Sequence, residues 1–234
     1  MNNYYLLHKK RIMREVKLAI PHYRRFIVES YDAELADAVV DETFERFTAL
    51  LPQIPYIGGD TNRLTENLYL TAAMLAFYEA LKSRGKPIEA AEIASIIYRG
   101  TVWMYSSFPF NAMLWWEGRK TFGRRNLEKL RREAAASQAR QYPADWVYSF
   151  VEGDGKTFDF GVDYTECGIV KYLTEQGARE LAPCLCWLDY PMCAAMRVGL
   201  IRTETIAQGS EKCNFRFCRR QGRAEIVPDF MKKD

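Results

Sequence analysis

The spacing of hydrophobic and polar residues divides the chain into a helical part and a part that contains strands. Hydrophobic residues recur at three- and four-residue intervals through much of the first 104 positions. This period places them on one face of a helix, which can then pack against other helices. The helices that the spacing predicts cover 1–30 (broken at Pro21), 32–51, 64–81 and 87–104.

An aromatic group and a basic stretch follow these helices. The aromatic residues are Trp103, Phe108, Phe110, Trp115 and Trp116. Since such groups usually serve packing, we expect them in the core or in a pocket wall. The basic residues lie within 119–132 and are interspersed with Glu128, so we expect a solvated helix face rather than a nucleic-acid surface. The helix that carries them should end near Tyr142-Pro143.

After Pro143 the period changes to two, which is typical of strands. Trp146, Tyr148 and Phe150 alternate with other residues, as do Phe158, Phe160 and Val162, with Gly153-Asp154-Gly155 between the two runs. This pattern predicts a β-hairpin. The elements expected after it are helices over 168–180 and 183–196, a strand from Val198 to about Arg202, and a closing strand at Phe215 and Phe217.

The expected fold is therefore α+β, with a small antiparallel sheet and covering helices in the C-terminal part. We divide the chain into a helical region (1–143), an α+β region (144–220) and a polar tail (221–234). The first two regions are expected to form one compact unit.

Composition restricts the class of protein. The 234 residues are 48% hydrophobic and 27% charged, which is typical of a soluble globular chain. A net charge of +3 is too small to argue for nucleic acid. No apolar run approaches the ~20 residues that cross a bilayer, and the N-terminus lacks the apolar region of a signal peptide. We expect a cytoplasmic protein that acts on a small molecule without membrane or nucleic acid, and leave homo-oligomerisation open.

Several familiar chemistries lack their motifs. The two histidines, His8 and His22, are far from the cysteines in sequence. The chain has no glycine-rich phosphate loop, dinucleotide fingerprint or Gly-x-Ser-x-Gly elbow. We therefore expect no cofactor.

Five of the six cysteines lie between 167 and 217. Cys184, Cys193 and Cys218 are expected to be small buried hydrophobes. A metal would use Cys184 and Cys186 together with Cys167 or Cys213, but Cys-x-Cys is not the usual Cys-x-x-Cys spacing of structural zinc, so we expect no metal. The thiols are expected to be reduced.

A polar pocket is the remaining interpretation of this segment. Cys186 and Asp189 are three residues apart and would share one face of a helix. A thiolate beside Asp189 needs a nearby positive charge. Arg202 or Arg216 would supply this charge, or would instead hold a substrate carboxylate. If 200–206 is a strand, Arg202 lies on one face and Thr203 and Thr205 lie on the other.

The order of these motifs is similar to one known family. The motifs are Cys167, Gly177-Ala-Arg-Glu-Leu181, Cys186-Trp-Leu-Asp-Tyr190, Arg202-Thr-Glu-Thr-Ile-Ala-Gln-Gly209 and Cys213-Asn-Phe-Arg-Phe217. They resemble those of the L-2-amino-thiazoline-4-carboxylic acid hydrolase family and cover about the last third of the chain. One departure is Asn214, which stands where the family commonly has Asp.

The resemblance implies hydrolytic opening of a 2-amino-thiazoline ring to N-carbamoyl-cysteine, a step of amino-acid metabolism. It implies catalytic roles for Asp189 and for a cysteine nucleophile, either Cys186 or Cys213, with Cys167 beside them. It also implies that the substrate-binding residues are Arg202, Thr203, Thr205, Asn214 and Arg216. The alternatives are a non-catalytic domain that binds a small ligand or a metal, and a hydrolase of another cyclic C–N or C–S substrate.

Overall fold

The computed structural model describes residues 3–83 and 89–219. The expected polar tail (221–234) lies outside them. The N-terminal part is helical, as expected, and the break at Pro21 separates two helices. Its helices are α1 (Tyr4–Leu7), α2 (Lys9–Ala19), α3 (Pro21–Ser30), α4 (Ala33–Leu50), α5 (Thr65–Lys82), α6 (Ala90–Ser106), α7 (Phe110–Thr121) and α8 (Arg124–Ser137), with short 3-10 turns η1 (Leu51–Gln53) and η2 (Gly59–Thr61).

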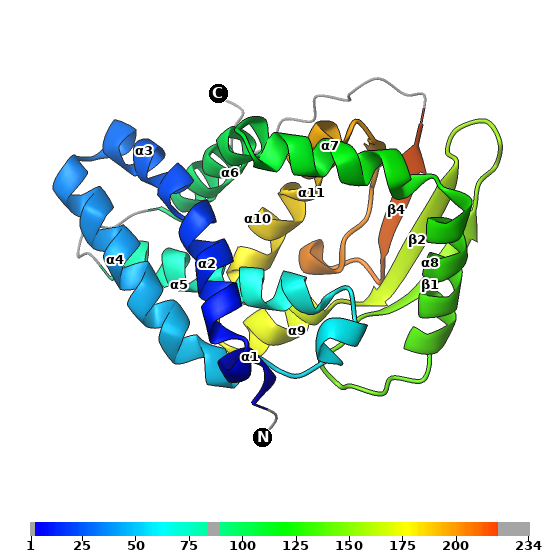
Figure 1. Ribbon diagram of the computed structural model, residues 1–234, viewed down its shortest axis with the longest axis horizontal. Helices are drawn as coiled ribbons and strands as arrows, with labels where there is room; N and C mark the ends of the chain where they lie inside the picture. The colour runs from blue at the N-terminus through cyan, green and yellow to red at the C-terminus, as the bar shows by residue number, and fades with distance from the viewer. Residues whose placement is uncertain (1–2, 84–88, 220–234) are drawn as a thin grey trace.

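The C-terminal part contains the sheet and further short helices, which confirms the α+β class. Its elements are β1 (Val147–Glu152), β2 (Phe160–Glu166), α9 (Gly168–Glu175), η3 (Arg179–Leu181), α10 (Ala182–Trp187), α11 (Asp189–Met196), β3 (Gly199–Ile201), η4 (Ile206–Gln208) and β4 (Cys213–Cys218). The four strands are antiparallel in the order β1-β2-β4-β3. Figure 1 shows the sheet at one end of the molecule and α3 and α4 at the other, with α9, α10 and α11 between them.

The core draws on both parts of the chain. Helix α5 is buried around most of its circumference and packs against α4 and α9. Tyr172 and Leu173 of α9 are fully buried in the same hydrophobic cluster as Phe47 and Phe77. The short helices that precede the closing strand are therefore anchored on the N-terminal helices.

The sheet has an inner, apolar face and an outer, polar face. On the inner face, Val162 pairs with Phe215 and Tyr164 pairs with Cys213. The next residues along each strand, Asp163 and Asn214, point to the opposite face because side chains alternate along a strand. The predicted hairpin is confirmed as β1 and β2.

Two expectations for the middle of the chain are wrong. The basic stretch is not one helix, because α7 ends at Thr121 and α8 begins at Arg124. The aromatic group is mostly at the surface: the exposed fractions of Trp103, Trp116 and Phe108 are 46%, 57% and 83%. These residues lie around the corner between α6 and α7, where Arg25 covers the ring of Trp103 with its guanidinium 4.7 Å from the ring centroid.

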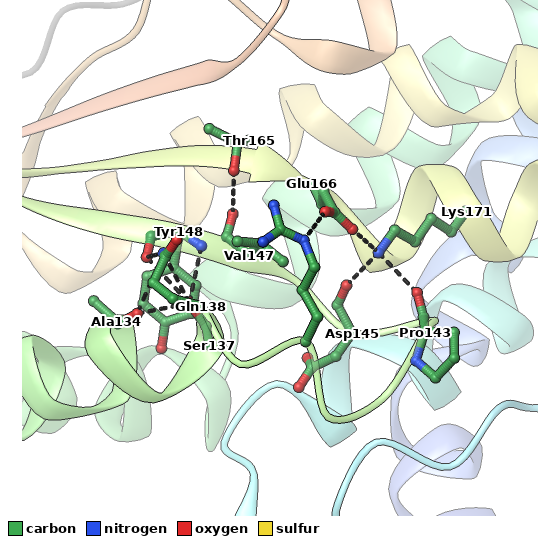
Figure 2. A network of polar contacts seen from close by, with 11 residues as sticks. Ala134, Ser137, Gln138, Pro143, Asp145, Val147, Tyr148, Thr165, Glu166 and Lys171 are labelled. Carbon is green, nitrogen blue, oxygen red and sulfur yellow. Dashed lines mark hydrogen bonds and ion pairs between the residues drawn. The ribbon is translucent and has the colours of Figure 1, made fainter.

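A lysine joins the start of the sheet to α9. The Lys171 ammonium donates to the carbonyl oxygens of Pro143 and Asp145, each at 2.8 Å, and to the carboxylate of Glu166 (Figure 2). Arg140 donates to the other oxygen of Glu166. This network fixes the chain where it changes from helix to strand. No helix within the described ranges is long and apolar enough to span a membrane.

Candidate active site

The site is built around the junction of two short helices. The sequence predicted one element over 183–196, but the chain forms α10 and α11, with Leu188 between them. Cys186 lies in the last turn of α10, and Asp189 is the first residue of α11. Helix α11 packs closely on α7, since a Cβ on Gly118 would lie 1.9 Å from the carbonyl oxygen of Met196. This contact fixes the helix that carries Asp189.

Asp189 forms a buried ion pair with Arg202. The Arg202 Nη1 lies 2.5 Å from the Asp189 Oδ2, and the exposed fractions of the two side chains are 4% and 30%. The pair joins two of the motifs that the sequence singled out. The carboxylate is the member that solvent or a ligand can reach.

Arg202 is almost fully buried and makes several contacts besides the ion pair. Its Nη2 donates to the carbonyl oxygen of Cys186 at 2.7 Å. Its guanidinium lies between the rings of Tyr190 and Phe215, at 5.0 and 4.9 Å from their centroids. The Tyr190 hydroxyl also donates to the Arg202 carbonyl oxygen at 3.1 Å. These contacts make Arg202 the residue that holds Asp189 in place.

The environment makes Asp189 a stronger base than an ordinary aspartate. Burial raises the pKa of Asp189, and the opposing effect of Arg202 does not cancel this rise. Asp189 in turn raises the pKa of Arg202 against the effect of burial. Within the part of the chain that the structure describes, Oδ2 accepts the hydrogen bond from Arg202 and no hydrogen bond reaches Oδ1. One carboxylate oxygen is therefore free for a substrate proton.

Three cysteines of the motifs lie in the electrostatic neighbourhood of Asp189. Burial raises the pKa of Cys167 to about 11. Burial and then Asp189 raise the pKa of Cys186. Burial also raises the pKa of Cys213, although the Ile206 N–H, which donates to Sγ at 3.2 Å, acts against this rise. All three groups are therefore held as neutral thiols.

The remaining cysteines are buried, as expected. Cys184, Cys193 and Cys218 have exposed fractions of 7%, 4% and 2%. Cys218 donates to the carbonyl oxygen of Thr157 at 3.2 Å. In the described segments, no group of three histidine, cysteine or acidic residues is arranged to hold a metal ion.

Asn214 and the two threonines organise the segment that carries Arg202. The strand expected from Val198 to about Arg202 is confirmed as β3, but it ends at Ile201, so Thr203 and Thr205 are not part of it. The Asn214 Oδ1 accepts the N–H groups of Thr203 and Glu204, both at 2.9 Å, and its Nδ2 donates to the Thr203 hydroxyl at 2.8 Å. Thr205 caps η4 by accepting the Gln208 N–H. These residues therefore shape the loop that follows Arg202.

The structure does not bring Arg216 to the ion pair. Arg216 Nη1 lies 2.6 Å from an oxygen of Asp163, and Lys212 lies 2.7 Å from the other oxygen. The Arg216 side chain crosses Gly161 on the outer face of the sheet. Arg202 covers the ring of Phe215, which belongs to the inner face. The sheet thus separates the two arginines.

The motif Gly177-Ala-Arg-Glu-Leu181 has a structural role. Gly177 follows α9 with a φ of +71°, a conformation that glycine adopts more readily than other residues. Glu180 accepts a hydrogen bond from Tyr78 at 2.9 Å, and Lys82 lies 3.6 Å away. The motif therefore ties the segment before α10 to α5.

A cavity of about 820 Å³ opens beside α11, although Asp189 itself is not among the residues that line it. Met192 and Cys193, three and four residues beyond Asp189, line it, as do Tyr164 of β2 and Arg63. Asp189 raises the pKa of Tyr164, whereas Arg63 lowers it and burial is the largest cause of the net rise to about 12. Tyr164 is therefore influenced by both Arg63 and Asp189.

Sequence reasoning missed three residues of this neighbourhood. Tyr190 had a usable signal, since it is the aromatic residue directly after Asp189 in its motif. Tyr164 and Arg63 had none, because only the fold brings a strand of the hairpin and the loop before α5 to α11.

Comparison with known proteins agrees with the motif resemblance. The family model described as L-2-amino-thiazoline-4-carboxylic acid hydrolase matches residues 66–217, from α5 to β4. No curated protein and no solved structure matches the chain. The match covers more than half of the sequence and includes the Asp189–Arg202 pair and the sheet up to Phe217. The chain belongs to the L-2-amino-thiazoline-4-carboxylic acid hydrolase family.

Proposed function

We propose that this protein hydrolyses the ring of L-2-amino-thiazoline-4-carboxylate, or of a close cyclic amidine, to the N-carbamoyl product. The observation that carries the proposal is the Asp189–Arg202 ion pair, which leaves one carboxylate oxygen free in a partly accessible position. The family to which the chain belongs supports this class of substrate.

Asp189 suits an amidinium group. The ring nitrogen and the exocyclic amine of a protonated 2-amino-thiazoline both carry N–H groups beside the electrophilic carbon. A carboxylate accepts such hydrogen bonds strongly when both groups are charged. Arg202 fixes the carboxylate, so that its free oxygen lies where water would attack. Asp189 then acts as general base, for which a raised pKa is an advantage.

The proposed reaction adds one water across the C–S bond. Asp189 takes a proton from the water as the oxygen attacks the carbon between sulfur and nitrogen. The C–S bond then breaks, and protonated Asp189 returns this proton to the sulfur. The hydroxyl of the intermediate becomes the carbamoyl oxygen, and its proton leaves to solvent. The ring nitrogen keeps its bond to carbon, which gives the N-carbamoyl product with a free thiol.

The substrate carboxylate needs a cation other than Arg202. Arg63 lines the same cavity, and its one ion pair among the described residues is a long contact of 3.7 Å with Glu133. We assign Arg63, which lines the cavity together with Tyr164, to the carboxylate. A zwitterionic ring would then lie between the two charges. Thr203, Thr205 and Asn214 position Arg202 in this arrangement, and Arg216 stabilises the outer face.

We assign the role of nucleophile to water rather than to a cysteine thiolate. A thiolate requires a lowered pKa, but burial raises the pKa of Cys167, Cys186 and Cys213. We assign the three thiols to the wall of the site.

The test is turnover of L-2-amino-thiazoline-4-carboxylate in 18O-labelled water, followed by mass spectrometry of a single turnover. The proposal expects N-carbamoyl-cysteine with one 18O atom from the first turnover onward. Failure of the folded, reduced protein to form this product would favour another cyclic substrate or a binding role. Stoichiometric zinc in such inactive protein would favour the metal-binding alternative.

A further inference from the structure

The cavity beside Asp189 is large for a single thiazoline ring. Its volume of about 820 Å³ lies in the upper part of the range of ~300–1,000 Å³ that holds drug-sized ligands. The ring and its carboxylate would occupy the inner end, near Tyr164. The outer part extends between the inner face of the sheet and helices α7, α8 and α11; Figure 1 shows α8 beside the sheet and α7 running toward it.

The walls of the outer part are apolar and partly aromatic. Phe160 and Phe217 line it from adjacent strands, with their ring centroids 4.9 Å apart, but Phe160 is only 3% exposed and also stacks on Phe150. Phe217 is partly exposed, and Met196 and Val198 also line the cavity. Stacked rings and flexible thioether groups favour a flat, apolar ligand group.

The rim of the cavity carries an excess of positive charge. Lys120, Arg124 and Arg125 line it, against one acidic residue, Glu117. Lys120 pairs with Glu117 at 2.7 Å, and Arg124 pairs with Glu128, also at 2.7 Å. Arg125 makes no ion pair with any residue that the structure describes. The rim therefore has a guanidinium available to an incoming anion.

We propose that the outer part of this cavity binds an aromatic carboxylate, with the ring against Phe217 and Met196 and the carboxylate at Arg125. This site goes beyond the proposed hydrolysis and does not depend on it, because it uses neither Asp189 nor Arg202. Arg125 can reach a carboxylate with two N–H groups, and the apolar wall removes the ring from water.

The probe is 1-naphthaleneacetate, with the neutral 1-naphthaleneacetamide as its matched analogue. Isothermal titration of the full chain should show saturable binding of the acid, at least about fivefold tighter than binding of the amide, as one exposed charge-assisted contact allows. Arg125→Gln should reduce this preference to about twofold or less and leave the affinity for the amide unchanged. Arg132→Gln, an exposed arginine on α8 outside the cavity, is the control and should keep the preference.

A second variant tests the apolar wall. Met196→Trp places a large ring in the cavity and should abolish binding of both probes, with its fold checked by circular dichroism. Equal affinity of wild type for the acid and the amide would overturn the proposal. The absence of saturable binding would also overturn it, as would an unchanged preference for the acid in Arg125→Gln. Arg125→Gln needs no rearrangement of the core, so it tests the site even if Met196→Trp does not fold.

Discussion

The side-chain oxygen of Asn214 accepts the backbone N–H of Thr203 at 2.9 Å, and the same oxygen accepts the next N–H, that of Glu204. An aspartate oxygen at this position would accept the same two hydrogen bonds. The family residue that Asn214 replaces therefore has a structural use here, which is to hold the loop behind Arg202. The presence of Asn214 in place of the family aspartate therefore does not by itself imply a loss of catalytic activity.

Asn214→Asp should leave turnover within about threefold of wild type, because the two accepted hydrogen bonds are retained and the Thr203 hydroxyl can turn to donate. Asn214→Ala should destabilise the fold by about 0.5–1.5 kcal/mol, since two solvent-exposed N–H groups lose their acceptor. Thermal unfolding and turnover measured on both variants test this. A larger loss in Asn214→Asp than in Asn214→Ala would show that the position is not a hydrogen-bond clamp.

The pH dependence should report the ionisation of Asp189. A general base must be deprotonated, so kcat/KM should fall as pH decreases through the pKa of Asp189 in the free enzyme. Burial raises this pKa, so the midpoint should lie above the value of ~3.9 for an unperturbed aspartate.

Arg202 provides a sharper form of this test. Arg202 lowers the pKa of Asp189, so Arg202→Lys, which cannot reproduce the paired contacts to Asp189 and Cys186, should move the midpoint to higher pH and reduce turnover. Arg216→Lys, on the outer face of the sheet, is the matched control and should leave the midpoint unchanged. A midpoint that stays in place or moves to lower pH in Arg202→Lys would contradict the assigned role.

The cysteines should be dispensable for chemistry. Cys213→Ser and Cys186→Ser should each keep turnover within about tenfold of wild type, because water is the proposed nucleophile. Cys184→Ser, a buried position away from the ion pair, measures the cost of placing a hydroxyl in the interior. Loss of all turnover in Cys213→Ser, with the fold of Cys184→Ser and Cys213→Ser equally intact, would instead show a thiol nucleophile.

The Lys171 network should contribute to stability without contributing to turnover. Lys171→Met removes the donor to two backbone carbonyl oxygens and to Glu166 (Figure 2), and should cost about 1–2 kcal/mol, less than for a fully buried group. Lys129→Met, whose ammonium makes a longer exposed contact of 3.6 Å with Glu133, is the control. Urea unfolding of the two variants measures the difference, and equal midpoints would contradict this role.

The sequence predicted the helices and the hairpin because their periods are clear. The alternation of Phe160 and Val162 correctly predicted the second strand of the hairpin, β2. The aromatic group at the corner of α6 and α7 was misplaced, because hydrophobic character alone does not say whether a ring such as Phe108 is covered by another part of the chain.

The candidate site was predictable only in part. Asp189 and Arg202 were identified from motif and residue type, but their direct contact depends on how α11 and β3 pack. The same contact is the reason why we propose a positioning role for Arg202 instead of the expected substrate binding. Arg63 lies outside the matched family segment and reaches the cavity only through tertiary structure.

The most direct measurement compares kcat/KM for L-2-amino-thiazoline-4-carboxylate in wild type, Asp189→Asn and Asp163→Asn. Asp163→Asn is the matched control, because Asp163 is also a carboxylate paired with an arginine, but on the outer face of the sheet. The account predicts a loss of about 10²–10⁴-fold in Asp189→Asn, as expected for removal of a general base, and near-normal activity in Asp163→Asn. Near-normal turnover by folded Asp189→Asn would contradict it.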